Sequence, residues 1–306
     1  MTKRPIIIDT DPGIDDAVAI AIALFSDELD VKLLTTVSGN VSLDKVTINL
    51  LKLLTFWQKR VPVAKGAVKP LTRHNEDASG IHGASGMDGY EFDEPDYSLL
   101  LKEHAVEAMR NVIISSPEKI TLVPIGPLTN IALLLTTYPE VKTNIEEIVL
   151  MGGSATRGNY GVLSEFNIGF DPEAAKIVFE SGLNIVMAGL DVGWKALVFH
   201  DDSLKIKAQN KTGEMIYALF QKYRSGSLKT GLKMYDSCAI AYLLKKEMYE
   251  TVYTHVSIET KGEYTSGATL VDLKGYLKKE PNVTVCMDID ANMFSDWLLQ
   301  ALSKCN

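Results

Sequence analysis

The feature that most constrains the fold is a regular alternation of short apolar runs with amphipathic stretches over the first two thirds of the chain. The apolar runs lie at 5–9, 31–37, 61–64, 120–125, 147–151 and 184–190. Stretches with helical spacing lie between them, near 15–25, 43–58, 103–114, 127–137 and 171–181. Continuous apolar strands separated by helices are typical of a mainly parallel sheet covered on both faces. The sequence therefore predicts an α/β fold.

The last third of the chain has a different rhythm. Helical segments near 213–223 and 236–248 come first, followed by strand-like runs at 252–260, 268–273 and 283–287 and a final helix near 290–303. This order predicts helical and short antiparallel additions to the same sheet. No proline-rich linker, repeat or low-complexity tract marks a boundary, so we expect residues 1–306 to form a single domain.

One stretch, 66–98, interrupts the alternation with glycines, acids and few periodic apolar residues. Loops longer than about 12–15 residues in compact domains are usually functional or disordered. The stretch is either a flap over a binding site or a surface excursion without a role, and we favour the flap.

Composition excludes several classes of protein. The 31 basic residues against 39 acidic ones give a charge of −8, which argues against a nucleic-acid polymer as partner because phosphate binding depends on lysine and arginine. No apolar run reaches the roughly 18 residues of a membrane span. The three cysteines are far apart, and the five histidines include no close pair, so neither a disulfide framework nor a zinc site is expected. We expect a cytoplasmic protein without a membrane partner.

Acidic residues gather where the first predicted strand ends. Asp9, Asp11, Asp15 and Asp16 fall within eight residues that contain no base. Ligands of open α/β sheets bind outside the carboxyl ends of the strands, and hard divalent cations prefer carboxylate and carbonyl oxygens. The alternative is that Asp15 and Asp16 only favour the start of a helix. Because unpaired carboxylates at one strand end repel one another, we favour a metal site.

A second polar concentration lies in the glycine-bearing loop before the 171–181 helix. Asn159, Glu165 and Asn167 are amides and an acid that could hold vicinal hydroxyl groups. The alternative is that these side chains only cap the helix and form the turn.

Six motifs, taken in order, resemble the inosine–uridine nucleoside hydrolase family. They are DTDPGIDDA at 9–17, TTVSGN at 35–40, HGASGM at 82–87, GPLTNIA at 126–132, VLMGG at 149–153 and EFNIGFDPEAA at 165–175. The chain is most similar to members that hydrolyse both purine and pyrimidine ribonucleosides. The resemblance implies one α/β domain, a bound Ca²⁺, cleavage of the N-glycosidic bond to ribose and free base, and a homo-oligomer, a dimer or a tetramer.

The resemblance also implies roles for individual residues. It implies calcium ligands at Asp11, Asp15, Asp16 and Asp236 and at the backbone carbonyl of Ile125. The implied substrate pocket contains Asp15, Asn40, Met151, Asn159, Glu165, Asn167 and Tyr223, with His82 on the flap near the base. Asp11 is the implied general base that activates the attacking water.

The sequence departs from the family pattern at one position. Many members carry a histidine just before the last calcium-binding aspartate, where this chain has Tyr235 before Asp236. An unperturbed tyrosine has a pKa near 10, about four units above that of histidine. Three ways to protonate the departing base stay open: donation by Tyr235, donation by His82, or protonation from solvent. Alternatively, Tyr235 only packs against the pocket wall.

Two other functions compete with the hydrolase. A nucleoside- or ribose-binding protein could retain the metal pocket without its chemistry. An aspartyl phosphotransfer enzyme also places acids after its first strand, but the proline and glycine inside DTDPGIDD fit that class poorly. We therefore predict a calcium-dependent ribonucleoside hydrolase.

Overall fold

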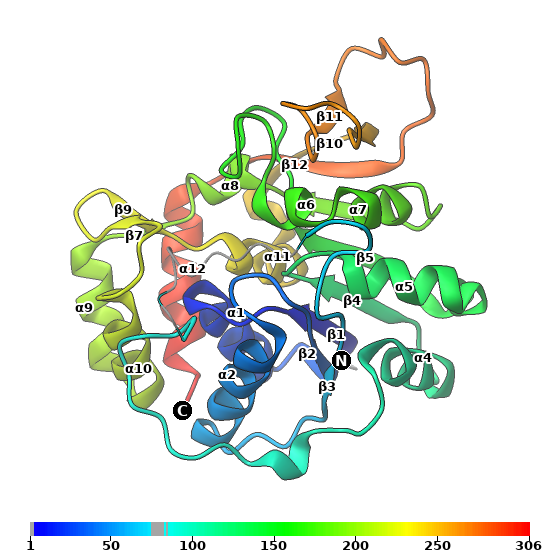
Figure 1. The fold of residues 1–306 in the computed structure, drawn as a ribbon. Coiled ribbons are helices and arrows are strands. Elements are labelled where there is room, and N and C mark those ends of the chain that lie inside the picture. Colours follow the sequence, from blue (N-terminus) through cyan, green and yellow to red (C-terminus); the bar gives the residue numbers. More distant parts are fainter. Residues whose placement is uncertain (1–2, 75–82, 84) are drawn as a thin grey trace.

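A nine-stranded sheet forms the centre of the computed structural model, which describes residues 3–74, 83 and 85–306 (Figure 1). In sheet order the strands are β11 (Thr269–Asp272), β10 (Tyr249–Ile258), β12 (Val283–Ile289), β6 (Ile185–Ala188), β5 (Ile145–Met151), β4 (Ile120–Pro124), β1 (Arg4–Thr10), β2 (Leu29–Thr36) and β3 (Val63–Lys65). Neighbouring strands from β3 to β12 are parallel. Strands β10 and β11 are antiparallel to their neighbours. The predicted α/β fold with a mainly parallel sheet is confirmed.

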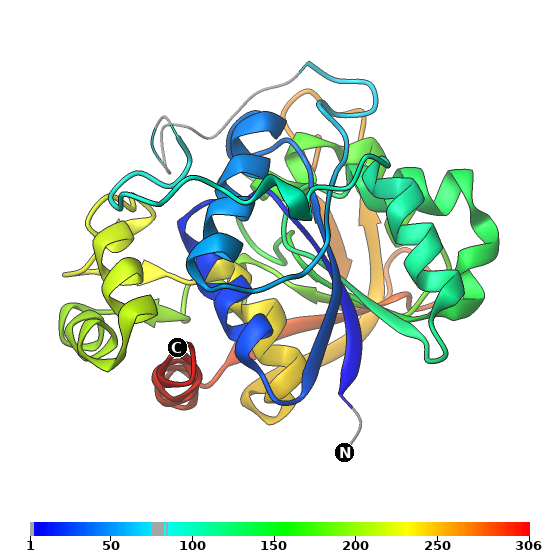
Figure 2. The same cartoon turned by 90° about the horizontal axis from the view of Figure 1, so that it is seen from below.

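Helices cover both faces of this sheet (Figure 2). One face packs against α1 (Ile14–Phe25), α2 (Leu43–Phe56), α11 (Tyr235–Leu244) and α12 (Ala291–Ser303), and the other against α4 (Ala105–Ser115), α5 (Thr129–Thr137) and α7 (Pro172–Phe179). Successive strand side chains point to opposite faces. In β1, Ile6 and Ile8 therefore join the first core and Ile7 the second. This double burial explains why the strands read as continuous apolar runs.

The last third of the chain extends the same sheet, as expected. Strand β12 pairs in parallel with β6, and only β10 and β11 form the antiparallel part. The sequence did not indicate α6 (Phe166–Phe170), α8 (Leu190–Gly193), α9 (His200–Gln209) or the small sheet of β7 (Leu197–Val198), β9 (Gly231–Lys233) and β8 (Gly226–Ser227). Helix α9 buries only Ser203 and Ile206, so it has almost no apolar periodicity.

The remaining elements are α10 (Lys211–Phe220) and the 3-10 turns η1 (Tyr97–Leu99), η2 (Pro139–Asn144) and η3 (Lys246–Met248). Helix α10 matches the helical segment predicted near 213–223. None of the helices in the described part of the chain is long and apolar enough to cross a membrane.

The stretch expected to be a flap is tied to the body on both sides of its middle. The Asp171 carboxylate accepts the backbone N–H of Leu71 at 2.8 Å. The Asn49 amide donates to the carbonyl oxygens of Ser85, at 2.8 Å, and Pro12, at 3.1 Å. Its described residues before η1 form turns without a regular helix or strand. Residues 75–82 and 84, which include His82, lie outside the described residues.

Candidate active site

A cavity of about 570 Å³ lies at the carboxyl ends of the central strands. The strand order reverses between β1 and β4, which is where ligands of open α/β sheets bind. The described residues that line the cavity are Asp11, Asp15, Asn40, Ile125, Met151, Asn159, Tyr160, Glu165, Phe166, Asn167, Trp194, Tyr223, Arg224, Ser225, Gly226, Lys233, Tyr235 and Asp236. Acids, amides, aromatic side chains and two cations line the cavity together.

Four buried carboxylates form what we call the acid cluster: Asp11, Asp15, Asp16 and Asp236. Asp15 and Asp16 lie in the first turn of α1 and Asp236 in the first turn of α11, and carboxylate oxygens of these three lie within 4.8 Å of one another. Burial, and then repulsion by Asp16, raises the pKa of Asp15 to about 8. Burial also holds the pKa values of Asp11 and Asp236 well above the usual range.

The acid cluster has no counter-charge from the protein among the described residues. The ion pairs between described residues include none of its four carboxylates. Several buried carboxylates without a cationic partner are costly when ionised. A hard divalent cation, which binds oxygen ligands, would offset this cost, so the donor set fits such an ion.

Two glycines make room for the Asp11 carboxylate. A Cβ atom on Gly39 would collide with Asp11 Oδ2, and one on Gly126 would lie 2.6 Å from Oδ1. Between these glycine backbones, Oδ2 accepts the Asn40 N–H at 2.7 Å. The carboxylate is therefore held in one position at the cavity wall.

Asp16 has a partly structural role. Its carboxylate accepts the Gly13 N–H at 2.9 Å and the Thr10 hydroxyl at 2.6 Å, and it caps α1. Asp16 belongs to the acid cluster but does not line the cavity among the described residues. The helix-start interpretation thus describes part of its role.

Asp9, the first aspartate of the motif, is not among the described residues that line the cavity. Its Oδ1 accepts the hydroxyl of Thr35 and the amide of Asn130, the latter at 2.8 Å. Its Oδ2 is buried without a hydrogen-bond partner, and burial raises the pKa of Asp9 to about 7. Burial without a cationic partner among the described residues thus favours the neutral form of this carboxyl group.

Glu165 and Asn167 form a hydrogen-bonded wall beside the acid cluster. The Asn167 amide donates to the carbonyl oxygens of Ile125, at 3.0 Å, and Met151, at 3.2 Å. Glu165 accepts the N–H groups of Asn167, at 2.9 Å, and Gly153, at 2.9 Å, and caps α6. Burial raises the pKa of Glu165 to about 7 in spite of these hydrogen bonds. Glu165 is therefore an N-cap, here of α6, and also lines the cavity.

Further lining residues come from residues 223–233, which we call the 223–233 hairpin, and from Tyr235. Tyr223 donates its hydroxyl to the carbonyl of Lys233 at 3.1 Å. The side chain of Ser225 hydrogen-bonds both Tyr223 and Tyr235. Burial raises the pKa of each tyrosine, so both phenols keep their protons at neutral pH.

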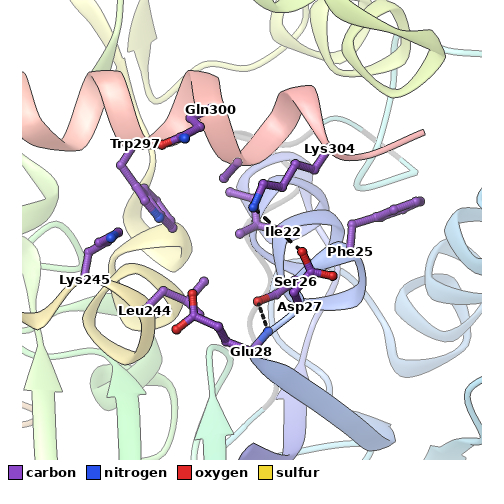
Figure 3. A pocket seen from close by; sticks show the side chains of 11 residues that line it. Ile22, Phe25, Ser26, Asp27, Glu28, Leu244, Lys245, Trp297, Gln300 and Lys304 are labelled. Atoms are coloured by element: carbon purple, nitrogen blue, oxygen red, sulfur yellow. Dashed lines mark hydrogen bonds and ion pairs between the residues drawn. The ribbon is translucent and has the colours of Figure 1, made fainter. Parts of the chain in front are cut away.

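A second cavity, of about 150 Å³, lies at the other end of α1 and α11 (Figure 3). Phe25 of α1, Leu244 of α11 and Trp297 of α12 line it, and Lys304 pairs with Asp27 at its edge (Figure 3). The acid cluster lies at the first turns of the same two helices. This second cavity is therefore separate from the candidate active site.

The sequence profile of the family described as inosine-uridine preferring nucleoside hydrolase matches residues 6–296. The chain belongs to this family. It is 52% identical over 298 residues to a non-specific ribonucleoside hydrolase RihC of Salmonella enteritidis, and this alignment covers 97% of each chain. The purine-preferring ribonucleoside hydrolase from Gardnerella vaginalis has a similar structure, with a TM-score of 0.91 at 28% identity over 99% of each chain. Family membership makes the chain a hydrolase that acts on N-glycosyl compounds.

For this nucleoside hydrolase family member, most residues expected at the site from the sequence line a single cavity. They are Asp11, Asp15, Asn40, Ile125, Met151, Asn159, Glu165, Asn167, Tyr223, Tyr235 and Asp236. Asn159 is exposed at the rim, where its Oδ1 accepts the Phe166 N–H at 2.9 Å. Asp16 is not among the described lining residues, and His82 lies outside the described residues.

The sequence did not identify several lining residues, namely Tyr160, Phe166, Trp194, Arg224, Ser225, Gly226 and Lys233. Most of them belong to short elements that periodicity could not predict, such as the β8–β9 pairing of the 223–233 hairpin. The only available signal was the cluster of glycine, serine and basic residues at 224–233, directly before Tyr235.

Proposed function

We propose that this chain is a calcium-dependent ribonucleoside hydrolase that cleaves the N-glycosidic bond of purine and pyrimidine ribonucleosides. The observation that carries the proposal is the acid cluster, which is buried, has no cationic partner among the described residues and opens into a cavity lined by amides and aromatic rings. The name of the Salmonella relative, a non-specific ribonucleoside hydrolase, supports the breadth of the substrate range. The products are ribose and the free base.

Calcium would be held by the carboxylates of Asp11, Asp15, Asp16 and Asp236 and by the carbonyl oxygen of Ile125. When bound, the ion supplies positive charge and a template for the oxygen atoms of water and sugar. The Ile125 carbonyl already accepts the Asn167 amide at 3.0 Å. A carbonyl oxygen has two lone pairs, so it can serve both partners.

Asp11 acts as the general base in this proposal. Its carboxylate lines the cavity and is fixed by Asn40 and by the close backbones of Gly39 and Gly126. A fixed acceptor within hydrogen-bond reach of the attacking water can take its proton as the new C–O bond forms. Cleavage of the C–N bond then leaves an oxocarbenium-like ribose.

Electrostatic stabilisation of that sugar comes from the wall beside the acid cluster. Glu165 and Asn167 are less than a tenth exposed, and hydrogen bonds fix both side chains before substrate arrives. Prearranged dipoles and charges in a site sheltered from water stabilise developing positive charge. Asn40, Met151 and Asn159 line the same part of the cavity and would contact the sugar.

Tyr235 and Tyr223 would contact the base, together with His82 from the flap. Because burial raises the pKa of Tyr235, the phenol retains its proton and can donate a hydrogen bond to the base. The same raised pKa opposes full proton transfer from Tyr235. Protonation of the departing base by His82 or by solvent is compatible with this arrangement.

The decisive test of the proposed function is ribose release by the purified, calcium-loaded protein. Uridine, inosine, adenosine and cytidine are incubated separately, and reducing sugar is measured. We expect ribose from at least one purine and one pyrimidine nucleoside. No ribose from any of the four would overturn the proposal.

The rival function is a nucleoside- or ribose-binding protein that retains the metal pocket. It predicts heat of binding by calorimetry with uridine or ribose but no free base in the recovered sample. The Asp11 carboxylate, which a binding protein does not need as a proton acceptor, favours the hydrolase. Chromatography of the calorimetry sample distinguishes the two functions.

We further propose a cytoplasmic homo-oligomer, a dimer or a tetramer. Its structural support is a group of exposed apolar side chains around the edge strand β11. Val162 is 69% exposed, Leu273 53% and Tyr276 78%. Light scattering of the purified protein measures the mass directly, and a monomer at micromolar concentration would contradict this part of the proposal.

A further inference from the structure

We propose that Arg224 is a catalytic residue that stabilises the negative charge of the departing base. This inference rests on the proposed function, because it concerns the leaving group of the same reaction. If Arg224 stabilises the anionic base in this way, the base need not receive a proton while the C–N bond breaks.

The first support is the distribution of charge in the cavity. Among the described lining residues, only Arg224 and Lys233 are cationic, and both belong to the 223–233 hairpin. Of the four lining acids, Asp11, Asp15 and Asp236 lie together at the start of α1 and α11 and before them, and Glu165 is the N-cap of α6. In the proposed binding mode the sugar hydroxyls of the nucleoside face the acids and amides, and its base faces the hairpin that carries the two cations.

The second support is the anchoring of the backbone around Arg224. Tyr223, on one side, is buried and hydrogen-bonds Asp15 and the Lys233 carbonyl. Ser225, on the other side, accepts the Lys233 N–H through its carbonyl at 3.2 Å and binds both tyrosine hydroxyls through its side chain. Arg224 therefore comes directly after Tyr223, which hydrogen-bonds Asp15 of the acid cluster. Arg224 itself is exposed and lines the cavity.

The third support is the chemistry of the guanidinium group. It stays protonated throughout the accessible pH range and presents a planar fork of donors. The uracil anion carries its negative charge on a ring nitrogen and an adjacent exocyclic oxygen. Such a pair of acceptors suits bidentate binding by arginine.

The step balances as follows. The C1′–N bond breaks with both electrons going to the base nitrogen, and the water oxygen forms the new bond to C1′. The proton of the water goes to Asp11. The base leaves as an anion paired with Arg224 and takes a proton from solvent after release, while Asp11 returns its proton to solvent.

The test compares two substrates that differ in their need for leaving-group stabilisation. Uridine requires it, whereas p-nitrophenyl β-ribofuranoside releases a stable phenolate without help. For Arg224→Met we expect kcat on uridine to fall on the order of 10- to 100-fold, and kcat on the phenyl riboside to change by less than about threefold. An equal loss on both substrates, or no loss on uridine, would overturn the proposal.

Lys229→Met is the matched control. Lys229 lies in the same hairpin, is exposed and is not among the described lining residues, so its removal changes the net charge equally. We expect this variant to retain the wild-type rates on both substrates. A uridine-selective loss in Lys229→Met would assign the effect to overall charge and overturn the role of Arg224.

Chemical rescue gives a second readout. Guanidinium chloride at millimolar concentration should restore part of the uridine activity of Arg224→Ala, because a free guanidinium can occupy the vacated place. Failure of rescue together with unchanged substrate selectivity overturns the inference. Failure of the proposed function is distinguishable, because the wild-type protein would then release ribose from neither substrate.

Discussion

Two sets of residues that line the cavity are built in different ways. The acid end is formed by residues that directly follow strands of the central sheet or begin the helices after them, and their side chains are hydrogen-bonded and buried. The second set, which we call the base end because the proposed function places the base there, consists of the 223–233 hairpin and Trp194, outside the central sheet. Rigid, buried residues at the acid end suit the ribose, which all ribonucleosides share. A separate hairpin at the base end suits the base, which varies from one nucleoside to the next.

The largest expected effect is at the acid end. Asp11→Asn keeps the shape of the side chain between Gly39 and Gly126 but removes the proton acceptor. We expect kcat on uridine to fall by about three to four orders of magnitude, with the circular dichroism spectrum unchanged. Near-normal turnover would remove Asp11 from the role of general base.

Asp9→Asn is the matched control for this variant. Asp9 is an equally buried aspartate of the same motif, but it does not line the cavity among the described residues. Its Oδ1 contacts with Thr35 and Asn130 can persist in the amide. We expect less than about a tenfold loss of kcat. A loss as large as that of Asp11→Asn would mean that disturbance of the motif, and not loss of the base, explains both.

Metal removal tests whether a cation balances the acid end. The ion should stabilise the protein by about 4 kcal/mol at a concentration 1,000 times its Kd, so chelation should abolish activity and lower Tm by several degrees. Without the ion, burial raises the pKa values of Asp15 to about 8 and of Glu165 to about 7, above their values in the unfolded chain. The folded protein then binds more protons than the unfolded chain between about pH 4 and pH 8.

The sign of the pH dependence follows from this difference in bound protons. The free energy of unfolding of the metal-free protein should fall as pH rises through that window. With calcium the carboxylates are already ionised and balanced, so Tm should vary much less. Thermal unfolding between pH 5 and pH 8.5, with EDTA or with calcium, measures both curves. Parallel curves would show that no cation offsets the acid cluster.

Tyr235→Phe tests the base end and should have a smaller effect. The variant removes the hydroxyl that is hydrogen-bonded by Ser225 but keeps the aromatic ring. If the phenol assists purine departure, kcat on inosine should fall by about tenfold while kcat on uridine changes less. Ser225→Ala is the companion variant, since it removes a hydrogen-bond partner of Tyr235 and leaves the ring and hydroxyl in place. Equal rates for Tyr235→Phe and wild type on both substrates would leave protonation to His82 or solvent.

The same contrast explains what the sequence could and could not predict. The strands buried on both faces read as continuous apolar runs, so the sheet was predicted correctly, and the residues expected at the ends of β1, β2, β4 and β5 line one cavity. The 223–233 hairpin pairs only two or three residues per strand, and β8 is exposed, so neither periodicity nor apolar content marks it. Arg224 and Trp194 line the cavity because of tertiary packing, which no local sequence pattern predicts.

The smallest expected effect concerns Thr269, which lies outside the cavity and supports the loop next to Glu165. Thr269 of β11 donates its hydroxyl to the Ser154 carbonyl at 2.5 Å and accepts the Ser154 N–H at 2.8 Å. Ser154 follows Gly153, whose N–H binds Glu165. The antiparallel addition at the end of the chain thereby holds the loop that positions a cavity residue.

Thr269→Val keeps the size of the side chain and removes both hydrogen bonds, which should cost about 1–3 kcal/mol of stability. If Thr269 positions Glu165, KM for uridine should rise by about three- to tenfold with kcat changed by less than twofold, and Thr269→Ser should restore KM. Kinetics well below Tm separate this effect from unfolding. A lower Tm with KM unchanged would mean that Thr269 stabilises the fold but does not position Glu165. The parallel part of the sheet would then position the acid end alone.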